Sequence, residues 1–165
     1  AQATPAHADT VDSLVSSSKG TLNIEAGSLK LESVSDIQFA NTKFDPAGMT
    51  ATLDAEALSG KEAKVSDATF AQAGWTISGS VSEDAPASLT INTDKALSTE
   101  AQTIFTHTAD AQDINQTAAI NSATMSLTAK QVADATKHTT TDTAAVTVDV
   151  NWTLAQVTPA ATFNN

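Results

Sequence analysis

The sequence predicts an all-β fold: a single antiparallel β-sandwich, Ig-like in broad architecture, with long loops. Residues 145–154 alternate between apolar and polar side chains, the period of a half-buried strand. Thr and Val are abundant and favour pleated surfaces, whereas long helices would need more Leu, Glu and Lys. Turn signals recur about every 8 to 12 residues, which predicts roughly seven to nine short strands.

Size and charge narrow the class of protein and its partners. The 165 residues suit one domain. Asp and Glu total 19 against 8 Lys, for a formal charge of -11, so nucleic acid is excluded as a partner because phosphate binding needs clustered basic residues. Cysteine is absent, which rules out disulfides and Cys-based metal sites. No apolar run reaches the roughly 20 residues of a membrane span.

The first third of the chain reads as a lead-in followed by strands. Residues 1–19 show neither helical nor strand periodicity and are expected to be a flexible lead-in. Alternation begins at residue 20, pauses at Gly27 and resumes at Leu29, which predicts two strands around a Gly turn or bulge. Further strands are expected at residues 34–39, 49–53 and 63–65.

The rest of the chain contains both the clearest strand periodicity and the segment with the weakest periodicity. Strands are predicted at residues 74–81, 89–91, 120–127 and 145–154, with a short helical turn at residues 129–137. Residues 95–115 are polar and Thr-rich, and a long loop is expected there. Pro159 ends the last strand, and residues 159–165 form a C-terminal tail.

Two short motifs hold the only tryptophans of the chain. Each has a Trp, then a Thr, then a branched aliphatic residue; the six residues are Trp75, Thr76, Ile77, Trp152, Thr153 and Leu154. Upstream, residues 26–39 read Ala-Gly-small-Leu-x-Leu and then small-x-Asp-x-x-Phe, and a Val-x-Asp run ends at Asp67. Together these motifs resemble the WxL domain, a cell-surface module of low-GC Gram-positive bacteria, over residues 20–158. The chain departs from the family pattern after Asp67, where Ala68 and Thr69 replace a frequent Arg-Gly pair, and at Ile77, where Leu is usual.

The resemblance implies a secreted protein of the cell wall or cell surface. Its expected role is a non-catalytic module that attaches non-covalently to the Gram-positive wall, with peptidoglycan or another cell-wall polymer as ligand. The alternative is a structural subunit of a surface complex that docks with a membrane-anchored WxL-interacting surface protein, for which strand addition at an open sheet edge is a physical route.

The residues themselves give little support for catalysis. His7, His107 and His138 lie in separate segments without a second ligand at metal-site spacing, so no metal and no cofactor is expected. There is no Gly-x-Ser-x-Gly elbow, no Cys nucleophile and no glycine-rich phosphate loop. The sequence therefore favours a protein that is not an enzyme.

The tryptophans allow two interpretations. They could be aromatic platforms for a glycan, but their parity with Val and Ile favours burial in a sandwich core. In either case the two Trp strands should be neighbours in a sheet. If the rings are buried, ligand or partner contacts fall to polar residues nearby, and the candidates are Asp67, Ser78 and Asn151.

Overall fold

The computed structural model describes residues 14–109 and 112–158 and confirms an all-β antiparallel fold. Its elements are β1 (Leu29–Val34), β2 (Gly48–Leu53), β3 (Glu62–Asp67), β4 (Gly74–Ser80), β5 (Ser88–Ile91), β6 (Gln102–Thr108), β7 (Asn115–Ala119), β8 (Ala123–Thr128), α1 (Ala129–Thr136) and β9 (Asn151–Gln156). The C-terminal tail and the first 13 residues of the lead-in lie outside the described residues.

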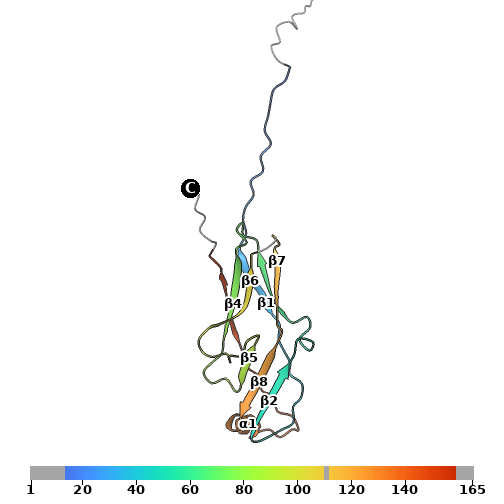
Figure 1. The fold of residues 1–165 in the computed structure, drawn as a ribbon, viewed down its shortest axis with the longest axis vertical. Coiled ribbons are helices and arrows are strands. Elements are labelled where there is room, and N and C mark those ends of the chain that lie inside the picture. The colour runs from blue at the N-terminus through green and yellow to red at the C-terminus, as the bar shows by residue number, and fades with distance from the viewer. Residues whose placement is uncertain (1–13, 110–111, 159–165) are drawn as a thin grey trace, which may run out of the picture.

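The strands form three antiparallel sheets with the orders β1-β3-β7, β6-β4-β9 and β2-β8-β5. Figure 1 shows an elongated molecule, with β1, β4, β6 and β7 in one half and β2, β5, β8 and α1 in the other. The sheets enclose one core of buried apolar residues: Leu58, Ala63, Val65, Trp75, Ile77, Val81, Leu89, Ile91, Leu97, Ile104, Phe105, Ile120 and Ala123.

The predicted helical turn is confirmed as α1, which packs against β2 and β8. Thr128 caps its first turn: the Thr128 hydroxyl accepts from the Gln131 backbone N–H at 3.2 Å, and the Gln131 side chain accepts from the Thr128 N–H at 2.9 Å. This reciprocal capping box satisfies two donors that a helix start leaves free. Val132 is the buried residue of the helix.

The prediction of a long loop at residues 95–115 is wrong, because β6 and the start of β7 lie within it. Ile104 and Phe105 are consecutive and both buried. The pairing with β4 passes from Ile77 opposite Phe105 to Ser78 opposite Thr103, so Ile104 is an extra residue in a β-bulge. The bulge interrupts the two-residue period, and it hid this strand from the sequence pattern.

The strand expected to start at residue 20 does not form. Residues 16–26 are exposed, belong to no element and make no backbone hydrogen bond to other described residues. After this segment, the Gly27 N–H donates to the Ala68 carbonyl at 2.8 Å. Figure 1 shows this segment in blue, leaving the end of the domain as an extended chain.

Two further segments are extended and half-buried without joining a sheet. Ile37 and Phe39 pack against the core from residues 36–44, and Val148 does so from residues 144–149. Neither segment makes a backbone-to-backbone hydrogen bond within the described chain. The predicted strand at residues 145–154 therefore keeps its alternating burial throughout, but it pairs as β9 only from Asn151 onward.

Candidate functional site

The two Trp motifs lie side by side, as the sequence predicts, because β4 and β9 pair antiparallel. Ile77 stands opposite Leu154, and Trp152 stands opposite Gly79. Trp75 and Ile77 are completely buried, whereas Trp152 and Leu154 are half-buried on the same core side. The six motif residues thus lie on one pair of adjacent strands.

Trp75 is a core residue with its polar edge satisfied. Its exposed fraction is 0%. The indole Nε1–H donates to the Gln116 side-chain oxygen at 2.7 Å, and the ring stacks on His107 with centroids 5.2 Å apart and planes 11° apart. A fully enclosed ring offers no face to a sugar, so Trp75 serves the core rather than a ligand platform.

Trp152 covers a glycine at the margin of the core. Its ring packs against Phe105 with a centroid distance of 5.5 Å. A Cβ at Gly79 would lie 2.8 Å from Cζ3 of Trp152, so the ring rests directly on the β4 backbone. Glycine at this position leaves the space that Trp152 fills.

The opposite face of β4 and β9 is polar. Thr76 and Ser78 of β4 alternate with the buried residues, and Asn151 and Thr153 of β9 are exposed. Ser78 stands opposite Thr153, and its hydroxyl lies 3.4 Å from that of Thr103 on β6. Ser78 and Asn151, two of the three candidate contacts, are therefore on one accessible hydroxyl-rich face.

The third candidate, Asp67, is buried at the end of β3, with an exposed fraction of 1%. Its Oδ1 accepts from the Thr69 N–H at 3.0 Å and from the Thr69 hydroxyl at 2.5 Å. Its Oδ2 is buried with no hydrogen-bond partner among the described residues. The Asp67 carboxylate holds the start of the loop between β3 and β4 rather than facing solvent.

Gln72 fixes the rest of that loop. It has a positive φ of 44°, a left-handed conformation that costs a non-glycine residue free energy and that clusters at functional sites. Its amide Nε2 donates to the Asp67 carbonyl at 2.6 Å, and its Oε1 accepts from the Asp113 N–H at 3.0 Å. The buried side chain therefore ties the β3–β4 loop to the segment before β7.

Gln116 of β7 completes the network. Its Nε2 donates to the Asp113 carbonyl at 2.9 Å and lies 3.3 Å from the Gln72 Oε1, while its Oε1 accepts from Trp75. We call the set Asp67, Thr69, Gln72, Asp113 and Gln116 the loop network. It connects the core tryptophan to two loops at one end of the domain.

These loops border an open hollow of about 380 Å³, which we call the loop hollow. Its lining residues are Ile24, Glu25, Gly27, Ala68, Thr69, Phe70, Gln72, Gln112, Asp113 and Ile114. Phe70 is 60% exposed, and the Gln112 amide donates to its carbonyl at 3.4 Å. An accessible aromatic ring beside amides, a hydroxyl and carboxylates can stack on the apolar face of a sugar and bond its hydroxyls.

Sequence reasoning found Asp67 but missed the residues around it. Phe70 is a single aromatic in a run of small residues, and Gln72, Gln112 and Gln116 belong to no motif. The one available signal was an isolated aromatic in a loop, since loops carry function on β scaffolds. The loop network depends on contacts between segments far apart in the sequence, such as the hydrogen bond from the Asp113 N–H to Gln72, whose positions differ by 41.

Comparison of the chain with protein-family models, curated proteins and solved structures finds no match. No helix in the described part is long and apolar enough to cross a membrane. Over residues 14–109 and 112–158, no three His, Asp or Glu side chains gather in a way that could hold a metal ion.

Proposed function

We propose that this chain is a non-catalytic, secreted module of the Gram-positive cell surface that binds a cell-wall glycan, with peptidoglycan as the first ligand to test. The observation that supports glycan binding is the loop hollow, where exposed Phe70 stands among polar groups held in place by the loop network. The choice of the wall as the source of the glycan rests on the resemblance of the Trp motifs to the WxL domain.

In this proposal the loop network is a positioning device. Asp67 and Gln72 are buried, so they act by holding Thr69 and Phe70 at the border of the hollow. A rigid loop loses less conformational entropy on binding than a mobile one, which favours affinity. Trp75 contributes indirectly, through its hydrogen bond to Gln116.

Phe70→Ala should weaken sedimentation with purified Gram-positive cell walls about tenfold, because it removes the stacking surface of the hollow. Since Phe70 is 60% exposed, the free energy of unfolding of the Phe70→Ala variant should stay within about 0.5 kcal/mol of that of the original chain. Phe44→Ala is the matched control, because Phe44 is 63% exposed and does not line the loop hollow. If the original chain stays in the supernatant, or if Phe70→Ala binds walls as well as Phe44→Ala does, the proposal is wrong.

An open sheet edge supports the second candidate function, a subunit that docks with a membrane-anchored WxL-interacting surface protein. β9 is an edge strand, and β4 is its one sheet neighbour among the described strands. A partner strand could pair with its free side. We expect the two proteins mixed together to elute earlier in size-exclusion chromatography than either protein alone. Gln156→Pro should abolish that shift if the β9 edge is used. The Val157 N–H donates to Gly74 of β4, so the N–H of the neighbouring Gln156 points to the other side of β9, and proline removes it. Separate elution of the two proteins would contradict this candidate.

A further inference from the structure

Residues 16–26, which we call the arm, have the pattern of a strand but no sheet. Leu22, Ile24 and Ala26 share one parity, and polar residues take the other. Leu22 is 83% exposed and Ile24 is 73% exposed. No backbone hydrogen bond joins the arm to other described residues. An unpaired strand with an apolar face gains both hydrogen bonds and burial when it adds to a sheet edge.

The arm is directed away from its own domain. The Gly27 N–H donates to the Ala68 carbonyl at 2.8 Å, and the Ala68 N–H donates to the Ser28 carbonyl at 3.1 Å. These two bonds extend the β1–β3 pairing to the end of the sheet, beyond which the chain leaves the body (Figure 1). To cover its apolar residues within the same copy, the arm would have to reverse direction at Gly27.

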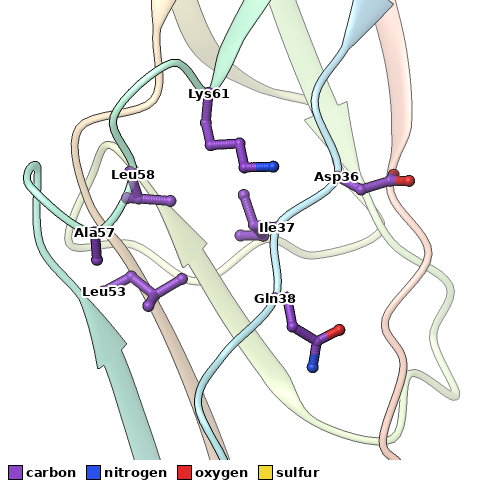
Figure 2. Close-up of a pocket in the computed structure, with 7 residues that line it drawn as sticks. All are labelled: Asp36, Ile37, Gln38, Leu53, Ala57, Leu58 and Lys61. Atoms are coloured by element: carbon purple, nitrogen blue, oxygen red, sulfur yellow. The ribbon is translucent and has the colours of Figure 1, made fainter.

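A groove that can receive the arm of another copy lies past the other end of β1. A hollow of about 200 Å³ separates residues 36–38 from the end of β2 and the turn that follows, and we call it the edge groove. Figure 2 shows Ile37, Leu53 and Leu58 converging on it, while Asp36 and Gln38 point away. The groove is therefore floored by apolar side chains.

Backbone groups are free on both sides of this groove. Residues 36–44 are extended and make no backbone-to-backbone hydrogen bond within the described chain. On the other side, β2 is the edge strand of the β2-β8-β5 sheet. An incoming strand can thus pair with the main chain while its apolar side chains enter the groove, the two components of strand addition.

We propose that the arm of one copy adds as a strand in the edge groove of a second copy, with Leu22 and Ile24 covering Ile37, Leu53 and Leu58. Each copy carries one arm and one groove at different places, so the contact is head-to-tail and can extend into a chain of copies. The net charge of -11 opposes association, so added salt should strengthen it.

Sedimentation velocity of the full chain over a range of concentrations tests the proposal. The original chain should form larger species as concentration rises. Leu22→Glu should weaken association about tenfold or more, because it places a charge in an apolar groove. Asn23→Glu is the matched control, since it adds the same charge to the opposite parity of the arm. Original-chain monomers at every concentration, or equal effects of the two variants, would overturn the proposal.

A second variant and its matched control test the edge groove. Ala57 is exposed and lines the edge groove, so Ala57→Glu should block the arm without disturbing the core. Ala55 is exposed in the same turn and does not line the groove, so Ala55→Glu should associate like the original chain. Association that survives Ala57→Glu would show that another surface is used and would overturn the assignment.

Mixing the two defective variants gives the decisive result. Leu22→Glu keeps a working groove, and Ala57→Glu keeps a working arm. Head-to-tail addition therefore predicts that, at a concentration where each variant alone is monomeric and the original chain associates, the mixture forms a heterodimer and nothing larger. Failure of the mixture to form it would contradict the mechanism, including the case in which the arm folds back onto its own copy. Ile24 and Glu25 belong to the arm and also line the loop hollow, so variants outside the arm separate this proposal from glycan binding: Phe70→Ala should still associate, and Ala57→Glu should still bind cell walls.

Discussion

Trp75→Ala is expected to lower the free energy of unfolding by about 3 to 5 kcal/mol, the range for removing a large aromatic side chain from a core. Trp75 is 0% exposed and packs with Ile77 and His107. The substitution also leaves the buried Gln116 side-chain oxygen without its 2.7 Å donor. Urea unfolding followed by far-UV circular dichroism measures the change.

Two further variants separate the contribution of the Trp75 hydrogen bond from that of ring burial. Trp75→Phe keeps most of the ring but removes the N–H, so it should cost about 1 to 3 kcal/mol, largely for the unsatisfied Gln116 oxygen. Trp152→Ala should cost about 2 kcal/mol, because Trp152 is only half-buried and less area returns to water. A Trp75→Ala variant as stable as the original chain would contradict a core role for this ring.

The sequence predicted the fold class and most strands because burial alternates along them. In β4 the buried Trp75 and Ile77 alternate with less buried polar residues, and the same parity runs into β9. Their adjacency followed from the similarity of the two motifs, and the pairing of Ile77 with Leu154 confirms it. A two-residue period is a local property, so one strand suffices to display it.

The failures arise where a local pattern and the tertiary environment disagree. In β6 the bulge at Ile104 places two apolar neighbours inside and breaks the period. In the arm the period is intact at Leu22 and Ile24, but no sheet lies beside it within the described chain. Periodicity reports which side chains could share a buried face, and it does not report whether a partner is present.

The candidate site was harder to predict than the fold because its geometry is non-local. Asp67 stood in a motif, but its burial and its bonds to Thr69 emerge only in three dimensions. Gln72 adopts a positive φ, which its residue type does not signal. The sequence thus predicted Asp67, at the end of β3, as a candidate contact. It could not show that Phe70 is the accessible group there.

Gly74, which follows the β3–β4 loop and begins β4, should tolerate no side chain. Its φ of 98° lies in the region that favours glycine, and a Cβ there would collide with the His107 carbonyl oxygen and lie 3.2 Å from the Ala109 nitrogen. His107 stands directly beside Gly74 and opposite Trp75 in the β4–β6 pairing, so neither strand can shift without disturbing the core. We expect Gly74→Ala to lower the free energy of unfolding by about 3 kcal/mol, from backbone strain and steric overlap together.

Gly60→Ala isolates the backbone part of that cost. Gly60 also has a positive φ, of 80°, but nothing lies within 4 Å of a Cβ built on it. Its substitution should therefore cost only about 1 to 2 kcal/mol for the left-handed conformation. The difference between the two losses of unfolding free energy, measured by urea unfolding, reports the steric cost of the close approach of β4 and β6 where the β3–β4 loop ends. Equal losses for Gly74→Ala and Gly60→Ala would mean that the strands can separate there, and that the loop bearing Phe70 is held less rigidly than its hydrogen bonds imply.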